Sequence, residues 1–198
     1  MSKTYQSDFS DEKQKTRIYL KGLIKTLDKK DLKIFSLPAS NFFFEKMVLK
    51  EYPEAEIDCV ENDRAVYNKN KDELPVPVNY FLDDAYGYLR RNSSKYDFIW
   101  LDLCGKYTTN NTFRIMSILQ NGLKDKCIFS VTLAAARENI SKNIEKLYNC
   151  TLDEYRTDIY PKQCVAMARR NHPAFNLVNV LEYKSNKIPM LLTTFQTW

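Results

Sequence analysis

The sequence is poor in the residues on which several common kinds of active site depend. It holds one histidine, His172, and none of its five cysteines forms a Cys-x-x-Cys pair. These shortages argue against a Cys/His zinc site, and no metal site is expected. They also leave a Ser-His-Asp or Cys-His hydrolase poorly supported. Glycine is rare as well, with four residues, so few positions suit a loop whose backbone must pass close to a ligand.

Long hydrophobic runs are missing too. No apolar stretch approaches the length of a membrane span, and the first eight residues contain no signal-peptide core. We therefore expect an intracellular, cytoplasmic protein without a membrane partner. Lys, Asn, Tyr, Ile and Phe are abundant, a bias typical of an AT-rich genome such as that of a virus or mobile element. The net charge of +5 permits a phosphate-bearing partner without requiring one.

The length of 198 residues fits one domain over 1–198, with residues 1–10 polar and frayed. Apolar runs typical of strands alternate with helical periodicity, which predicts an α/β fold with a mostly parallel sheet. The two last runs predict a closing hairpin. The expected strands are 32–37, 56–60, 78–82, 98–101, 127–133, 177–183 and 190–197. The expected helices are 11–27, 42–52 (capped by Ser40 or Asn41), 64–71, 84–91, 111–120 and 137–148, with 151–171 helical in part.

Carboxylates recur where the strands end. Glu61 follows the second run, Asp83 and Asp84 follow the third, and Asp102 follows the fourth, Phe98 to Leu101. In open α/β sheets, ligands bind outside the carboxyl ends of the strands. Acids after three strands in series predict one shared crevice.

The order of elements and acids resembles the class I S-adenosylmethionine-dependent methyltransferases, whose Rossmann-like sheet closes with a reversed C-terminal β-hairpin. The motifs are most similar to those of the tRNA guanine-N2 methyltransferases. Those enzymes carry Asp-Pro-Phe-Gly or Asp-Pro-Tyr-Gly after the fourth strand, Val-Thr-Ala-Thr in the fifth and Asp-Ala after the third. The matching segments here are Asp102-Leu103-Cys104-Gly105, Ser130-Val131-Thr132-Leu133-Ala134 and Asp84-Ala85.

The resemblance implies S-adenosyl-L-methionine as the cofactor. It assigns Glu61, beside Asn62, to the ribose hydroxyls, with Asp63 as the alternative. It assigns Asp84 to the adenine amino group, with Asp83 as the competing residue. The loop after the first strand would hold the rest of the cofactor through Ser36, Pro38, Ala39, Ser40 and Asn41.

The sequence departs from the family pattern at two places. The glycine-rich loop is absent, and Ala39-Ser40-Asn41 is a partial match with Asn41 in the glycine position. Asparagine tolerates left-handed backbone better than most residues. Proline is absent after Asp102, so Leu103 would supply the backbone carbonyl that accepts from a substrate amine.

The resemblance further implies methyl transfer to a nucleic-acid base, RNA or DNA, with an exocyclic amine favoured and Asp102 beside the reacting atoms. Cys104 is either a pyrimidine-attacking nucleophile, as in cytosine-C5 methyltransferases, or a packed thiol. Tyr107 is a candidate for stacking on a flipped base, and three arginines are candidates for substrate contact, Arg137, Arg169 and Arg170.

Two other functions remain open from the sequence. The eroded glycine loop and the missing proline favour a non-catalytic Rossmann-like binding module. A methyltransferase acting on protein or on a small molecule is the other reading.

Overall fold

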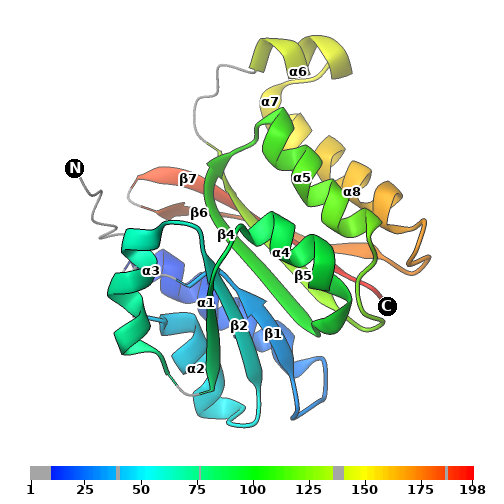
Figure 1. The fold of residues 1–198 in the computed structure, drawn as a ribbon. Helices are drawn as coiled ribbons and strands as arrows, with labels where there is room; N and C mark the ends of the chain where they lie inside the picture. Colours follow the sequence, from blue (N-terminus) through cyan, green and yellow to red (C-terminus); the bar gives the residue numbers. More distant parts are fainter. Residues whose placement is uncertain (1–9, 39–40, 76, 136–140, 186) are drawn as a thin grey trace.

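The protein is a three-layer α/β structure built on one seven-stranded sheet (Figure 1). The computed structural model describes residues 10–38, 41–75, 77–135, 141–185 and 187–198. The expected frayed segment, apart from Ser10, lies outside these residues. The strands are β1 (Lys33–Ser36), β2 (Glu56–Glu61), β3 (Val78–Leu82), β4 (Phe98–Lys106), β5 (Ile128–Ala134), β6 (Asn176–Ser185) and β7 (Ile188–Gln196).

The strand order is β3-β2-β1-β4-β5-β7-β6. The first five strands pair in parallel, and β7 runs antiparallel to both β5 and β6. The predicted mostly parallel sheet with a reversed C-terminal hairpin is therefore confirmed. The helical segments of the protein are α1 (Asp11–Lys25), α2 (Phe43–Glu51), α3 (Arg64–Asn70), η2 (Lys71–Glu73), α4 (Ala85–Asn92), η3 (Ser93–Lys95), α5 (Thr109–Gln120), α6 (Ser141–Tyr148), α7 (Leu152–Glu154), the π-helical turn η4 (Tyr155–Ile159) and α8 (Tyr160–Ala168).

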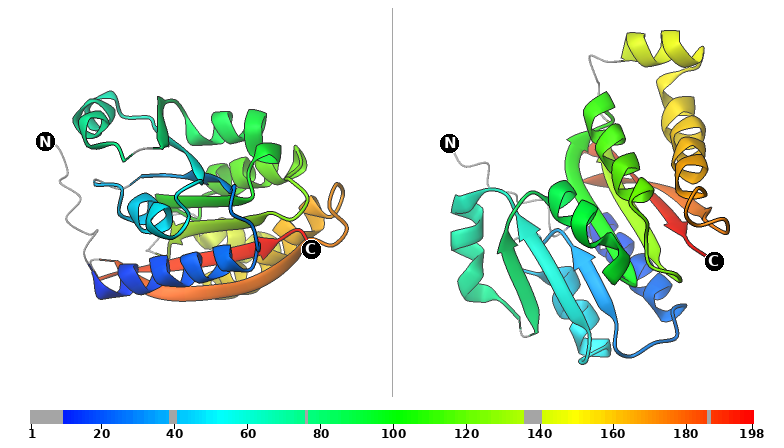
Figure 2. Two further views of the ribbon diagram at one scale, coloured as in Figure 1. Left: turned by 90° about the horizontal axis from the view of Figure 1, so that it is seen from below. Right: turned by 45° about the vertical axis from the view of Figure 1, so that its right-hand side comes forward.

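Helices cover both faces of the sheet, and the alternation along each strand explains why. In β1, Ile34 faces the core under α1 and α2, whereas Phe35 faces the core under α4, α5 and α8. In β4, Trp100 faces the same core as Ile34, and Ile99 faces the same core as Phe35. Figure 2 shows α1 and α2 on one side of the sheet and α4 and α5 on the other. Strands that are buried on both faces read as continuous apolar runs, which is the pattern the sequence has.

The helix ends follow local chemistry with one exception. Ser10 caps α1 by accepting from the Lys13 backbone N–H, and Gly122 follows α5 with φ +89°, as its C-cap position predicts. The expected Ser40 or Asn41 cap of α2 is wrong. Phe42 holds that position in left-handed conformation without a side-chain cap, because its ring is fully buried edge-on against Tyr80.

The buried face of α1 is partly polar. Leu20 and Ile24 are buried, as is Leu27 just beyond the helix, but Ile18 is 59% exposed. The first two turns instead bury Lys13, Thr16 and Arg17. Two positively charged side chains of α1, those of Lys13 and Arg17, are therefore buried rather than exposed to solvent.

A buried carboxylate, Asp97, lies just before β4 at the amino ends of the sheet and binds the first residue of β1 and two lysines outside the strands. Asp97 accepts from the Lys33 backbone N–H at 2.8 Å, from Lys29 at 3.1 Å and from Lys124 at 2.5 Å. Burial by itself raises the pKa of Asp97, but these three donors outweigh it and hold the pKa below 3.8. Since the native state binds the proton less readily than the unfolded chain, Asp97 stabilises the fold above pH 4.

We expect Asp97→Asn to lower the free energy of unfolding by about 1–3 kcal/mol at pH 7, because charge-assisted hydrogen bonds are lost in a buried site. The difference from wild type should begin to shrink as the pH falls below about 4, where the unfolded wild-type chain takes up the proton, and it should be lost once the pH passes the lowered pKa of the folded state. Urea unfolding at pH 7 and pH 3.5 measures this. A difference that stays the same at both values would contradict it.

No helix within the described ranges has the length and apolar character needed to cross a bilayer. Cys59, Cys127 and Cys164 are buried free thiols, as expected for small packed side chains.

Candidate functional site

The carboxyl ends of β3, β2, β1 and β4 lie along one edge of the sheet, in that spatial order (Figure 1). The register aligns Leu82 with Glu61 and aligns Ser36 with both Cys59 and Trp100. Glu61, Asp83, Asp84 and Asp102 therefore occupy one edge, as predicted. The last residue of β1, Ser36, stands between them.

Glu61 is the last residue of β2 and is half-buried. One of its oxygens, Oε1, accepts from the Asp63 backbone N–H at 2.8 Å, and no described residue hydrogen-bonds Oε2. Asp63 instead caps α3 through the N–H groups of Ala65 and Val66. Glu61 thus keeps acceptor capacity for two adjacent hydroxyls, whereas Asp63 is used by the helix. Asn62 is exposed beside them.

Asp83 and Asp84 have different surroundings. Both Asp83 oxygens are engaged, one by the Asp84 backbone N–H at 2.7 Å and one by Arg91 at 2.9 Å. Asp84 caps α4, which begins at Ala85, and its Oδ2 accepts from the Gly87 N–H and from Arg114. No described residue hydrogen-bonds Asp84 Oδ1. Of the two candidates, Asp84 retains the free oxygen.

Arg114 is a contact that the sequence did not reveal. Its guanidinium lies 2.5 Å from Asp84 Oδ2 and 3.9 Å from the centre of the Tyr86 ring. Burial raises the pKa of Tyr86 to about 12. The guanidinium therefore lies in contact with both the ring and the carboxylate after β3.

The loop after β1 is partly described. Ser36 is fully buried, and Pro38 is half-buried, while Ala39 and Ser40 lie outside the described residues. Asn41 has φ +81°, so the residue in the glycine position does adopt the left-handed backbone that its type tolerates.

Ser36 is joined to a buried acid that the sequence analysis missed. Its hydroxyl donates to Glu45 Oε1 of α2 at 2.5 Å, and Glu45 is 1% exposed. Burial raises the pKa of Glu45, and the Ser36 hydrogen bond and Arg17 oppose this rise. No described residue hydrogen-bonds the other oxygen, Oε2.

The segment after Leu101 corrects the expected end of the fourth strand at that residue. β4 continues to Lys106, and between its pairs Asp102–Thr132 and Lys106–Ala134 it advances four residues while β5 advances two. The residues between Asp102 and Lys106, Leu103 among them, therefore form a bulge directly after Asp102, a feature common beside active sites. A Cβ on Gly105 would lie 2.6 Å from the Asn111 side chain, which donates to the Lys106 carbonyl. The side chain of Cys104 lies outside the description.

Asp102 forms a buried ion pair. Its Oδ2 lies 3.0 Å from Lys13 Nζ of α1, with side-chain exposures of 11% and 9%. Neither Lys13 nor Arg17 was expected here, because a charged residue on an amphipathic helix ordinarily faces water. The available signal was their spacing, which continues the Leu20–Ile24 face toward the start of α1.

The substrate candidates need correction. Tyr107 is 1% exposed and packs edge-on against Tyr160 at 5.4 Å, so its ring has no open face for a base. Arg169 and Arg170 follow α8 and precede β6, whose first residue pairs at the level where β5 begins. They lie at the opposite edge of the sheet from Asp102. The sequence alone could not place the two arginines, because it left the structure of the segment that contains them, 151–171, open. Arg137 lies outside the described residues.

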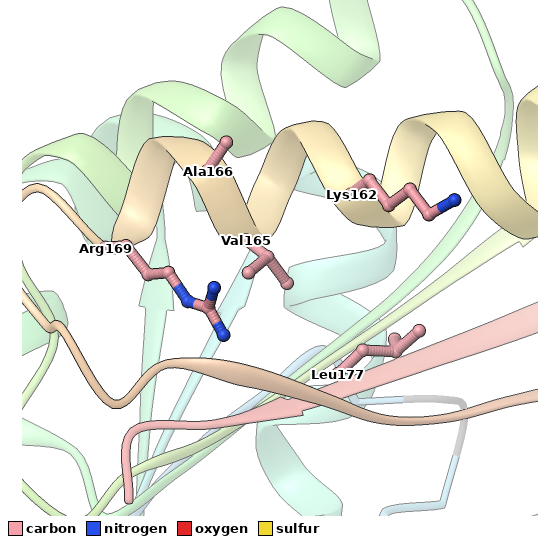
Figure 3. A pocket seen from close by; sticks show the side chains of 5 residues that line it. All are labelled: Lys162, Val165, Ala166, Arg169 and Leu177. Atoms are coloured by element: carbon pink, nitrogen blue, oxygen red, sulfur yellow. The ribbon is translucent and has the colours of Figure 1, made fainter.

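Arg169 belongs to a different surface. Its Nε donates to the Phe175 carbonyl at 2.9 Å, and it lines a shallow cavity of about 360 Å³ with Lys162, Val165, Ala166 and Leu177. Figure 3 shows Lys162, Val165 and Arg169 projecting from α8 on the side of Leu177. A second cavity, of about 410 Å³, lies between α5, α6 and α8 and includes Arg170.

No family model and no curated protein matches the sequence. Solved structures match its fold. Trm1 from Pyrococcus horikoshii, in complex with S-adenosyl-L-methionine, has a TM-score of 0.65 at 14% identity, and the match covers 95% of this chain and 56% of Trm1. The N-methyltransferase NodS from Bradyrhizobium japonicum, with S-adenosyl-L-homocysteine, has a TM-score of 0.57 at 10% identity over 100% of this chain and 93% of NodS.

A third match is the SAM-dependent methyltransferase from Agrobacterium tumefaciens, with a TM-score of 0.57 at 14% identity, covering 94% of this chain and 62% of that one. Because all three identities are low, the matches establish the fold alone. The chain has the fold of the class I S-adenosylmethionine-dependent methyltransferases, the group that its strand-terminal motifs resemble.

Proposed function

We propose that the protein is an S-adenosylmethionine-dependent methyltransferase. The observation that carries the proposal is the row of acceptors at one edge of a sheet with this strand order. Glu61 ends β2, Asp84 follows β3 and Asp102 lies in β4, and the family resemblance assigns these three to the ribose, the adenine and the reacting methyl group. Ligands of open α/β sheets bind at this edge.

The residues present suit the cofactor chemically. Glu61 would accept from the ribose hydroxyls with its oxygens, and Asp84 Oδ1 would accept from the adenine amino group. Asn62, Ala85 and the loop from Ser36 to Asn41 complete the proposed contacts. Bound S-adenosylmethionine supplies a methyl group on a sulfonium, which is the reactive part of the system.

The chain's own residues would position the acceptor. The Asp102 carboxylate would orient an amine and stabilise the positive charge that develops on its nitrogen. The Leu103 carbonyl, held in the β4 bulge, would accept a second hydrogen bond from the same amine. Alignment of the lone pair with the methyl–sulfur axis is the main contribution of such a site.

For the substrate we propose a nucleic-acid base, with an exocyclic amine favoured. The support is the motif resemblance to the tRNA guanine-N2 methyltransferases and the net charge of +5. We propose an intracellular location, where a nucleic-acid substrate is found. The test is transfer of radiolabelled methyl from the cofactor to separated cellular RNA, DNA and protein. Label in protein alone would contradict the substrate class and leave the methyl-transfer reaction standing.

Glu61→Ala is expected to weaken binding of S-adenosylhomocysteine by about 1–3 kcal/mol, because it deletes a charged hydrogen-bond acceptor. Isothermal titration calorimetry measures the change. Glu54→Ala is the matched control, because Glu54 is an exposed acid at the other end of β2. Equal affinities for wild type and Glu61→Ala would remove Glu61 from the site.

A non-catalytic binding module is the second candidate. It is favoured by the buried Lys13–Asp102 ion pair, which engages one oxygen of the proposed catalytic carboxylate. Binding of S-adenosylhomocysteine without label transfer to RNA, DNA or protein would support the module over the enzyme.

A further inference from the structure

Four charged side chains lie near one another at the edge that we propose binds the cofactor, and one of them, Glu45, is hydrogen-bonded to Ser36. Lys13 and Arg17 come from α1, Glu45 from α2 and Asp102 from β4. Arg17 and Glu45 are each 1% exposed and Lys13 is 7% exposed. Burial of so many charges is costly unless each finds an opposite charge or a ligand.

The contacts show that these groups form one cluster. Lys13 Nζ lies 3.0 Å from Asp102 Oδ2. Glu45 interacts electrostatically with both Arg17 and Asp102. Lys13 and Arg17 are four residues apart, so they share one face of α1. The cluster contains two positive and two negative groups.

Glu45 supplies a carboxyl group at the end of β1, which has no acidic residue of its own there. β2 ends in Glu61, β3 is followed by Asp83 and β4 carries Asp102, whereas β1 ends in Ser36. Glu45 reaches Ser36 from α2 at 2.5 Å and so adds a carboxyl group at that position. Its Oε2 is buried without a hydrogen-bond partner among the described residues, which is an unusual state for a buried polar atom.

We propose that Lys13, Arg17 and Glu45 bind the amino-acid group of the cofactor, in place of the glycine-rich loop that this chain lacks. This inference rests on the proposed function. The α-ammonium of the ligand donates to Glu45 Oε2, and its carboxylate accepts from Lys13 and Arg17. Lys13 has three donors, so it keeps its contact with Asp102 while it binds the ligand carboxylate.

The balance of charges selects this ligand class. A lone phosphate or other anion would suit the two cations but would face Glu45 and Asp102. A metal ion would suit the two carboxylates but would face Lys13 and Arg17. A zwitterion presents both charges a few ångströms apart and leaves the cluster neutral, which the low effective dielectric of a buried site strongly favours.

The geometry also gives Lys13 a positioning role. It would contact the ligand carboxylate and Asp102 together, and Asp102 is the group that we propose orients the acceptor amine. The residue thus couples the position of the methyl donor to that of the acceptor.

The test compares two ligands that share adenosine and the thioether. S-adenosylhomocysteine carries the amino-acid group, and 5′-methylthioadenosine does not. Calorimetry on the full chain should show that wild type prefers S-adenosylhomocysteine by about tenfold or more, as expected for charge-assisted hydrogen bonds. Glu45→Gln and Lys13→Met should reduce this preference toward one, with little change in affinity for 5′-methylthioadenosine.

Glu45→Gln keeps the oxygen that accepts from Ser36 and removes the charge, so the fold should persist, and Lys13→Arg should restore part of the preference that Lys13→Met loses. A preference that survives in both Glu45→Gln and Lys13→Met would overturn the inference and leave the proposed function intact. Equal binding of the two ligands by wild type would do the same. Binding of neither ligand by wild type would overturn the proposed function and this inference together.

Discussion

Asp102→Ala is expected to lower the free energy of unfolding by about 3–5 kcal/mol and to reduce methyl transfer by about 10²-fold or more. The first effect follows because the substitution leaves the buried Lys13 ammonium without its carboxylate, and breaking one side of a buried pair is strongly destabilising. The second follows because the group that stabilises developing charge on the acceptor is removed. Chemical denaturation and single-turnover label transfer, both at a temperature where the variant is folded, measure the two effects separately.

Two further variants separate charge from packing. Asp102→Asn keeps the shape and a hydrogen-bond acceptor for Lys13, so its loss of stability should be smaller while turnover still falls. The double variant Lys13→Met/Asp102→Leu removes both charges, and its stability should return close to wild type, since apolar replacement of a buried pair is often neutral. Undiminished label transfer by Asp102→Ala would exclude the catalytic role.

Phe35→Ala is expected to lower the free energy of unfolding by about 3–5 kcal/mol, the usual cost of truncating a buried phenylalanine. Phe35 is fully buried in the central strand β1, and its ring lies 5.8 Å from that of Tyr88 and 5.6 Å from that of Tyr96. Thermal unfolding should shift by about 2–4 °C for each kcal/mol in a protein of this size.

The control for Phe35→Ala is Ile18→Ala on α1. Ile18 is 59% exposed, so its truncation should change stability by less than about 0.5 kcal/mol. Similar losses for the two variants would mean that Phe35 does not lie in a tightly packed core.

The sequence predicted the sheet well because its central strands are buried on both faces. Such strands leave uninterrupted apolar runs, as in Phe98 to Leu101, and the acids after them are then placed at one edge by the parallel topology alone. The left-handed Asn41 and the Gly122 cap were predictable from residue type, since few residues accept that backbone conformation.

The rest depended on tertiary contacts that leave no periodic signal. The Phe42 cap position is fixed by burial of its ring rather than by a side-chain hydrogen bond. The β4 bulge arises from pairing with β5, and a single strand does not encode its register. Arg169 and Arg170 were assigned to the wrong edge because the sequence did not reveal that α8 runs away from the site.

The burial of Lys13 against Asp102 has a consequence for how the molecule assembles. The two residues are 89 positions apart, so their contact forms only after α1 has docked on a sheet that already contains β4. Contacts of such large sequence separation require loop closure before they contribute any stability. The sheet can therefore form before Lys13 and Arg17 join Glu45 and Asp102. Molecules in which α1 is undocked would keep their strand amides protected from hydrogen exchange, but they would lack the proposed ligand site.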